Sequence, residues 1–564
     1  MEALDWLVIG VFFLALIGII VWVVRQKQND SADYFLGGRD ATWLAIGASI
    51  FASNIGSEHL IGLAGAGASS GMAMAHWEIQ GWMILILGWV FVPFYSRSMV
   101  YTMPEFLERR YNPQSRTILS VISLVSYVLT KVAVTVYAGG LVFQQVFGIK
   151  ELWGIDFFWI AAIGLVVLTA LYTIFGGMKS VLYTSVLQTP ILLLGSLIIL
   201  VLGFKELGGW DEMMRVCGAV TVNDYGDTMT NLIRSNDDAN FPWLGALIGS
   251  AIIGFWYWCT DQFIVQRVLS GKNEKEARRG TIFGAYLKLL PVFLFLIPGM
   301  IAFALHQKYI GAGGEGFLPM LANGTANADA AFPTLVAKLL PAGVKGLVVC
   351  GILAALMSSL ASLFNSSAML FTIDFYKRFR PETPEKKLVG IGQIATVVIV
   401  ILGILWIPIM RSVGDVLYTY LQDVQSVLAP GIAAAFLLGI CWKRTSAQGG
   451  MWGLIAGMII GLTRLGAKVY YSNAGEMADS TFKYLFYDMN WLFFCGWMFL
   501  FCIIVVIVVS LATEAPTAEK IQGLVFGTAT KEQKAATRAS WDHWDIIHTV
   551  IILAITGAFY WYFW

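Results

Sequence analysis

Long apolar runs alternate with short polar connections along almost the whole chain. A run of about 20 residues can cross a bilayer as a helix, and runs of that length begin near residues 5, 42, 73, 117, 155, 179, 243, 279, 343, 388, 412, 448, 490 and 545. We therefore predict an all-α integral membrane protein with fourteen transmembrane helices in one domain, residues 1–564. Composition agrees, since 58% of the residues are hydrophobic and only 13% are charged, which excludes an ordinary soluble domain.

Lys and Arg gather in alternate connections between the apolar runs. The clusters are Arg25–Lys27, Arg97–Arg116, Arg267–Arg279, Lys377–Lys387 and Lys443–Arg444. Because short connections rich in Lys and Arg stay in the cytoplasm, we expect these to be cytoplasmic and both termini to lie outside. The N-terminal run has no small-residue cleavage site, so we expect it to be a retained helix. The absence of a transit peptide and the charge pattern indicate a plasma membrane or a bacterial inner membrane.

Two of the apolar runs carry polar residues in their interior. The segment FASNIGSEHL places Asn54, Glu58 and His59 in the run from 42, and Thr260–Gln262 interrupts the run from 243. Irregular backbone at membrane depth is tolerated only around a protein-lined cavity, and broken helices in corresponding halves of an inverted repeat indicate a transporter site. Five runs from 42 to 204 and five from 243 to 440 would form such repeats, with peripheral helices at about 5–24, 448–470, 490–513 and 545–564.

Glu78 and Lys288 are lone ionisable residues inside apolar runs. A buried charge costs several kcal/mol unless it is paired or hydrogen-bonded. Their partners could be each other, in a structural ion pair, or the hydroxyls of a ligand. His59 is either a ligand donor or a hydrogen-bonded residue between helices, and Asn54 could cap a broken helix end.

The run LMSSLASLFNSS offers hydroxyls at Ser358, Ser359, Ser362, Ser366 and Ser367. Such residues can serve tight helix packing, or, beside unwound carbonyls, an all-oxygen site for a hard monovalent cation. The residues alone leave both interpretations open. The small residues of GLAGAGASSG from Gly62 predict close approach of helices, not a nucleotide loop.

Enzyme and nucleic-acid functions find no support in the residues. The five histidines are scattered, so no Ser/His/Asp or Cys/His arrangement can be argued. The net charge is +1, and the chain lacks the basic stripe that phosphate-backbone binding requires.

Seven segments stand in a recognisable order: FASNIGSEHLIGLAGAGASSG from Phe51, TMPEFLERRYN from Thr102, LYTIFGG from Leu171, WYWCTDQFIVQR from Trp256, YLKLLP from Tyr286, ALMSSLASLFNS from Ala355 and FLLGICWKR from Phe436. They closely resemble the sodium/glucose cotransporters of the solute:sodium symporter family. The resemblance covers about residues 5 to 510. It implies the inverted five-plus-five repeat of the leucine-transporter fold, with core repeats at about 42–204 and 243–440, and alternating access around a midplane site.

The resemblance also implies sodium-coupled import of a sugar or polyol and assigns the site residues motif by motif. The substrate would be bound by Asn54, His59, Glu78, Tyr257, Trp258, Lys288 and Gln422. Tyr257 would be the inner gate, and Leu63, Trp77 and Tyr418 the outer lid. Na+, the coupling ion, would be bound by backbone oxygens of Ala52, Ile55 and Ala355 and the hydroxyls of Ser358 and Ser359.

Some positions depart from the family pattern. Ser185 stands where many relatives carry an aspartate associated with a second sodium site, so we expect one sodium ion per cycle. Gly254 replaces a polar residue that can reach a sugar hydroxyl, and Thr419 and Gln425 also differ from the glucose-type pattern. Galactose, glucose, mannose and myo-inositol therefore stay open as substrates. The alternatives are a sodium symporter for an amino acid or carboxylate, against which Glu78 argues, and a nontransporting sugar sensor.

Overall fold

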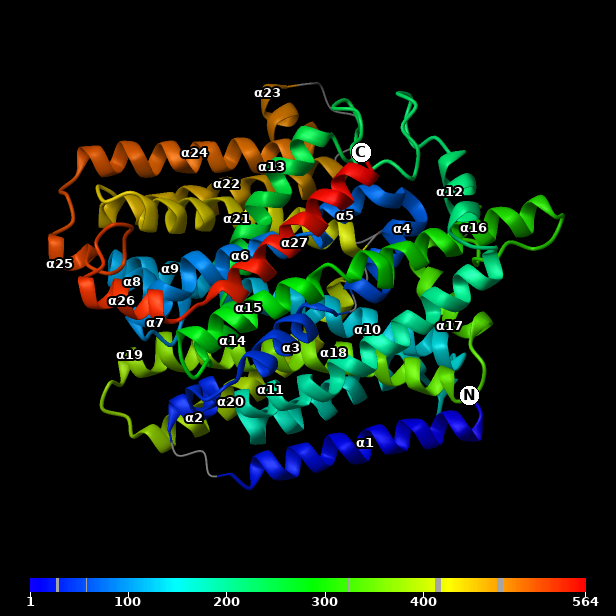
Figure 1. Ribbon diagram of the computed structural model, residues 1–564, viewed down its shortest axis with the longest axis horizontal. Helices are drawn as coiled ribbons and strands as arrows, with labels where there is room; N and C mark the ends of the chain where they lie inside the picture. Colours follow the sequence, from blue (N-terminus) through cyan, green and yellow to red (C-terminus); the bar gives the residue numbers. More distant parts are fainter. Residues whose placement is uncertain (27–29, 57, 322–323, 411–416, 474–479) are drawn as a thin grey trace.

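Nearly all the regular structure is α-helical, and the helices lie side by side along the long axis of the molecule (Figure 1). The computed structural model describes residues 1–564 apart from 27–29, 57, 322–323, 411–416 and 474–479. In the described part, two short strands, β1 (Glu151–Leu152) and β2 (Ile155–Asp156), pair antiparallel. The all-α architecture predicted from the apolar runs is confirmed.

The helices of the first part of the chain are α1 (Ala3–Val24), α2 (Ser31–Leu36), α3 (Trp43–Asn54), η2 (Glu58–Leu63), α4 (Ala64–Ser70), α5 (Ala75–Glu78), α6 (Gly81–Ile86), α7 (Val92–Ser98), α8 (Met103–Arg110), α9 (Pro113–Ser126), η5 (Tyr127–Val132), α10 (Ala133–Phe147), α11 (Phe157–Leu207) and α12 (Trp210–Gly218). Those of the second part are α13 (Trp243–Gly254), η6 (Phe255–Thr260), α14 (Gln262–Leu269), α15 (Glu274–Lys288), η7 (Val292–Leu296), α16 (Ile297–Gly311), η8 (Ala328–Ala330), α17 (Ala331–Leu339), α18 (Val344–Met369), η9 (Leu370–Tyr376), α19 (Lys377–Phe379), α20 (Glu385–Met410), α21 (Leu417–Cys441), α22 (Ala447–Asn473), α23 (Thr481–Lys483), α24 (Trp491–Ala512), α25 (Ala518–Ile521), α26 (Lys531–Ala539) and α27 (His543–Tyr562).

Eleven described helical segments are long and apolar enough to cross a membrane. This number is below fourteen partly because neighbouring helices are counted within one segment. α11 covers the runs from 155 and 179 as two helices that meet at a kink at Gly177, where φ is +53° and ψ is −151°. The segment Glu58–Ser98 contains the end of the run from 42 and the run from 73, which are separated at Gly71 (φ +70°, ψ −140°). In the run from 117, α9, η5 and α10 follow one another from Pro113 to Phe147.

Both interruptions predicted in the apolar runs are present. α3 ends at Asn54, Ile55 is extended (φ −80°, ψ 103°), and helix resumes at Glu58. In the other run, η6 ends at Thr260, and the extended Asp261 caps α14 by accepting from the backbone N–H of Phe263. Side-chain capping satisfies a backbone donor that the break would otherwise leave without a partner.

The interrupted helices pack around α18, near the middle of the bundle. In the most apolar window of the span that begins with α18, 89% of the residues are buried inside the protein, against 22% for α1 and α27. Figure 1 shows α1 and α24 at opposite edges of the molecule. The polar residues of α18 are therefore far from lipid and need partners within the protein.

Small residues bring α4 against its neighbours, as the sequence predicts. A Cβ atom on Gly67 would collide with the carbonyl of Leu296, and one on Gly299 with the carbonyl of Ala64. Close backbone contact of this kind needs glycine or alanine on both helices. The segment from Gly62 is thus a packing surface, which agrees with its rejection as a nucleotide loop.

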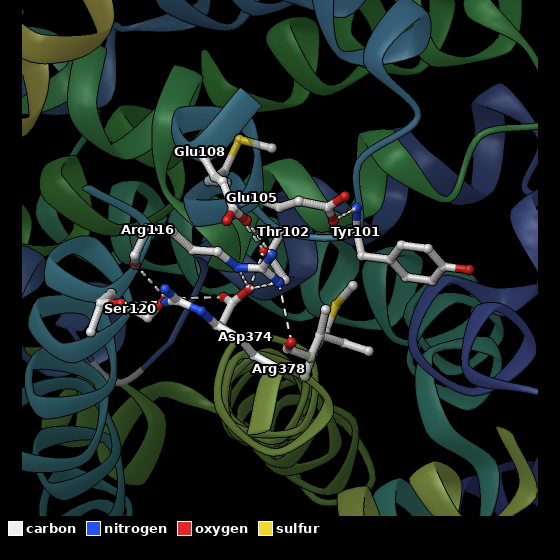
Figure 2. Close-up of polar contacts among 12 residues, drawn as sticks. Tyr101, Thr102, Glu105, Glu108, Arg116, Ser120, Asp374 and Arg378 are labelled. Carbon is white, nitrogen blue, oxygen red and sulfur yellow. Dashed lines mark hydrogen bonds and ion pairs between the residues drawn. The ribbon is translucent and has the colours of Figure 1, made fainter. Parts of the chain in front are cut away.

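A buried polar cluster fastens α8 and α9 to η9 at one end of the bundle (Figure 2). Asp374 accepts hydrogen bonds from the hydroxyls of Thr102 (2.8 Å) and Ser120 (3.1 Å). The guanidinium of Arg116 lies 2.7 Å from Asp374 and 2.6 Å from Glu108. We call this end of the molecule the α8 end.

Candidate functional site

An internal cavity lies where the interrupted helices meet. Its volume is about 50 Å³, room for about four water molecules, so its walls lie close together. Its lining comes from both breaks, from α5 and the turn after it, and from α13, α15 and α21: Asn54, Glu58, His59, Trp77, Glu78, Gln80, Ile253, Gly254, Tyr257, Trp258, Lys288, Gln422 and Gln425. Every residue that the family resemblance assigns to the substrate therefore lines one cavity.

Glu78 and Lys288 form an ion pair at the centre of this cavity. Lys288 Nζ lies 2.6 Å from Glu78 Oε2 and donates to Asn54 Oδ1 at 3.1 Å. His59 Nε2 lies 3.3 Å from the same glutamate oxygen. The two alternatives for Glu78 and Lys288 do not exclude each other, because the paired groups also line the cavity. Removing either partner of such a buried pair would cost about 3–5 kcal/mol.

Tyr257 and Trp258 form an aromatic wall beside the ion pair. The hydroxyl of Tyr257 accepts from Asn54 Nδ2 at 3.1 Å, and the rings of Tyr257 and Trp258 meet edge to face at 4.9 Å. Lys288 Nζ lies 5.3 Å from the centre of the Trp258 ring, within the range of a cation–π interaction. The contacts of Asn54 and Lys288 thus fix the position of the first break relative to the aromatic wall.

A second buried ion pair lies next to Tyr257, and sequence reasoning missed it. Lys131 Nζ lies 2.5 Å from Asp261 Oδ2, with both side chains less than 10% exposed, and the hydroxyl of Tyr127 donates to the other carboxylate oxygen. The ammonium also lies within 5.3 Å of four ring centres, those of Tyr127, Trp256, Tyr257 and Phe263. The cost of burying a lone lysine in an apolar run, the argument applied to Lys288, would also have identified Lys131.

The residues assigned to the outer lid lie in different surroundings. Trp77 lines the cavity, is 4% exposed, and stacks on Trp491 of α24 at 5.5 Å. Leu63 is fully buried but is absent from the cavity lining. The side chain of Tyr418 lies outside the residues that the structure describes.

The residues assigned to sodium bring the first break against α18. The hydroxyl of Ser359 donates to the carbonyls of Ser53 (2.9 Å) and Ile55 (3.2 Å), and the Ser358 and Ser185 hydroxyl oxygens are 3.3 Å apart. Ala52 and Ala355 are fully buried. Neutral carbonyl and hydroxyl oxygens are the donors with which broken-helix transporters bind Na+, so this set suits that ion.

Several lining residues were not assigned from the sequence. Glu58 was recognised only as part of the interrupted segment. Gln425 was recorded only as a departure, and Gln80 and Ile253 carried no signal. Their contribution depends on the way α5, α13 and α21 meet, which no local pattern encodes.

Comparisons with known proteins identify the family and the fold of the chain. Residues 34–457 match the model of the Sodium:solute symporter family. The chain is 37% identical to sodium/myo-inositol cotransporter 2 of Mus musculus, over 94% of this chain and 80% of the relative. It is 35% identical to sodium/glucose cotransporter 4 of Danio rerio, over 96% and 84%. The fold is similar to that of a Na+-coupled sialic acid symporter in a substrate-bound outward-open state, with a TM-score of 0.72, 22% identity, and coverage of 92% and 99%.

Proposed function

The chain belongs to the sodium:solute symporter family, and on that premise we propose that it imports a neutral polyhydroxylated ring, a cyclitol or a hexose, together with Na+. The relatives at 35–37% identity are named as sodium/myo-inositol and sodium/glucose cotransporters. The observation that carries the proposal is the single cavity in which Asn54, His59, Glu78, Lys288 and Gln422 converge. Myo-inositol and glucose are therefore the first substrates to test, followed by galactose and mannose.

The cavity groups match the chemistry of a ring with many hydroxyls. The carboxylate of Glu78 accepts from hydroxyls, the ammonium of Lys288 donates to them, and Asn54 can do both. Gln422 is 7% exposed, and its Oε1 accepts no hydrogen bond from any described residue, which leaves it free to accept from a substrate hydroxyl. Tyr257 offers an aromatic face on which the ring can stack.

An anionic substrate fits the lining less well. The cavity lining holds two carboxyl groups, those of Glu58 and Glu78, and one lysine, Lys288, so a carboxylate ligand would meet more acidic groups than lysines. The likeness to the sialic acid symporter concerns the fold and does not alter this balance. A neutral ring avoids the repulsion and uses the carboxylates as acceptors.

Coupling follows from the contact between the first break and α18. A sodium ion bound by the carbonyls of Ala52, Ile55 and Ala355 and the hydroxyls of Ser358 and Ser359 would tie α3 to α18. Asn54 lies at the end of α3, so fixing the break also fixes a substrate-binding side chain. Ser185 supplies a hydroxyl where a second sodium site would need a carboxylate, which favours one ion per cycle.

The energy of one ion is sufficient for strong accumulation. One charge moving through 100 mV releases about 2.3 kcal/mol, and a tenfold concentration gradient adds about 1.4 kcal/mol. Together these support accumulation of several hundredfold for a one-to-one symporter, because each 1.4 kcal/mol corresponds to a factor of ten.

The transport cycle would use alternating access in a fourteen-helix protein with two inverted repeats of five helices. The contracted cavity requires its walls to separate before a ring can enter, which such a cycle provides. We place the α8 end in the cytoplasm, because the Lys- and Arg-rich connections lie there. Both termini would then lie outside, in a plasma membrane or a bacterial inner membrane.

Uptake into proteoliposomes tests the proposal. The panel is myo-inositol, glucose, galactose, mannose and proline, with an inward sodium gradient and with potassium in place of sodium. Accumulation of a polyol or hexose only with sodium supports the proposal. Accumulation of proline alone would refute the sugar site, and binding without accumulation would indicate a sensor.

One variant with a matched control sharpens this experiment. Gln422→Ala should abolish uptake without loss of folding, because the Oε1 of Gln422 accepts no hydrogen bond within the described protein. The exposed Gln522 provides the control, and Gln522→Ala should transport normally. Normal uptake by Gln422→Ala would contradict the assignment of this residue to the substrate.

A further inference from the structure

Gln80 lines the cavity because the backbone is irregular just before it. α5 ends at Glu78 and α6 begins at Gly81, and between them Ile79 (ψ 24°) and Gln80 (ψ 23°) depart from helical geometry. In a regular helix, residues two apart point in different directions. Here Glu78 and Gln80 both line the same cavity, so the turn brings a second polar side chain to the site.

The amide of Gln80 is held against the wall formed by α13 and η6. Its Nε2 donates to the carbonyl of Ser250 at 2.8 Å, and its Oε1 accepts from the indole N–H of Trp258 at 3.3 Å. A glutamine amide has two N–H donors and two acceptor lone pairs. Within the residues that the structure describes, these two bonds use one of each, so one donor and one acceptor remain for a molecule in the cavity.

Gly254 makes room for this amide. Its dihedral angles (φ −63°, ψ −40°) are ordinary helical values, so the backbone does not require glycine, which weakens a helix relative to alanine. A Cβ atom at this position would lie 2.5 Å from Oε1 and 2.9 Å from Cδ of Gln80. Any side chain at position 254 would therefore displace the amide.

We propose that Gln80 binds a hydroxyl of the transported ring and, with Gly254, determines which ring the site accepts. This assignment rests on the proposed function. Because the free N–H and lone pair can donate to and accept from the same hydroxyl, a ring that lacks this hydroxyl is bound more weakly.

Monodeoxy analogues distinguish this role from a purely structural one. Gln80→Met keeps the side-chain size and removes both hydrogen-bonding atoms. Sodium-driven uptake of whichever of myo-inositol or glucose the wild type accepts should show a KM about tenfold higher. One monodeoxy analogue lacks the hydroxyl that Gln80 binds. For that analogue, the wild type and Gln80→Met should have equal KM values. An equal increase in KM for every analogue would overturn the assignment, since a residue that only supports Trp258 affects every ring alike. An unchanged KM for the parent ring would overturn it as well.

An exchange between the two positions tests the role of Gly254. Gly254→Ser alone should reduce uptake, and adding Gln80→Ala should restore it and change the preference among the analogues. Gly249 is the control, because it lies on the same helix but faces Leu492 of α24. Gln80→Ala should not rescue Gly249→Ser. No rescue at position 254, or equal rescue at both positions, would overturn the assignment.

Uptake by the wild type distinguishes a failure of the proposed function from a failure of the role of Gln80. A wild type without sodium-dependent uptake of any polyol or hexose would overturn both the proposed function and the role of Gln80. Normal wild-type uptake with unchanged Gln80→Met kinetics would overturn the role of Gln80 alone.

Discussion

Neutralising one partner of the Lys131–Asp261 ion pair should destabilise the protein more than neutralising both. The charged atoms are 2.5 Å apart, and the two side chains are 8% and 2% exposed. Removing one partner of such a pair leaves an uncompensated buried charge, at a cost of about 3–5 kcal/mol. In Lys131→Met the carboxylate keeps its bonds from Tyr127 and the N–H of Phe263, so we expect the lower part of this range.

The double variant Lys131→Met/Asp261→Asn should recover most of that loss. Its buried site carries no net charge, and an asparagine oxygen can still accept from Tyr127. Replacing a whole buried pair by neutral residues is often close to neutral in stability. We therefore expect the double variant to be more stable than either single variant, so the interaction energy in the double-mutant cycle must exceed the larger single loss of about 3–5 kcal/mol.

The apparent melting temperature in detergent, followed by tryptophan fluorescence, is a suitable assay. The control is the exposed pair of Glu212 and Arg215, whose side chains are 28% and 70% exposed. Glu212→Gln should leave the melting temperature nearly unchanged, because water screens an exposed ion pair. If the double variant melts no higher than the more stable of the two single variants, removing both charges does not relieve the uncompensated buried charge, and the reasoning is refuted.

Three further outcomes are expected. Ser359→Ala removes a hydroxyl bonded to the carbonyl of Ile55, so the sodium concentration for half-maximal uptake should rise about tenfold; an unchanged sodium dependence would contradict the site. Burial raises the pKa of Asp329, which lies outside the candidate spans, to about 6, so the folded protein holds this proton between about pH 4 and pH 6 while the unfolded chain releases it. Its contribution to stability falls as the pH rises through that interval, and Asp329→Asn should melt higher than wild type at pH 7.5 but not at pH 4; equal melting at pH 7.5 would argue against this burial. Asp374→Asn leaves the guanidinium of Arg116 without its buried partner, so the melting temperature should fall while the KM for substrate stays constant, and an unchanged melting temperature would show that the cluster of Figure 2 contributes little.

The membrane spans and the two broken helices could be predicted because bilayer costs act on each residue locally. A charged or amide side chain in an apolar run is expensive wherever the rest of the chain lies. Asn54, Glu78 and Lys288 therefore stood out before any contact was known, and all three line one cavity. The same reasoning, applied without exception, would have included Lys131.

The boundaries of the spans were less accessible. The helices predicted from 155 and 179 meet directly at the Gly177 kink within α11, and the segment Glu58–Ser98 contains the end of one predicted helix and the next, which meet at Gly71. Hydropathy records how long an apolar run is, whereas the path of the backbone depends on which neighbours it packs against.

The sequence by itself determined that this chain is a helical membrane protein with polar residues at two helix breaks, because the cost of burying those groups depends on residue type alone. Only the tertiary structure decided their partners. Glu78 and Lys288 are 210 positions apart, and Ser359 meets a carbonyl 304 positions away. In the sequence, Gly254 stands out only as a position without a polar side chain. In the structure, its lack of a side chain leaves room for the amide of Gln80. Such pairings depend on distances between helices, which hydropathy and motif spacing do not contain.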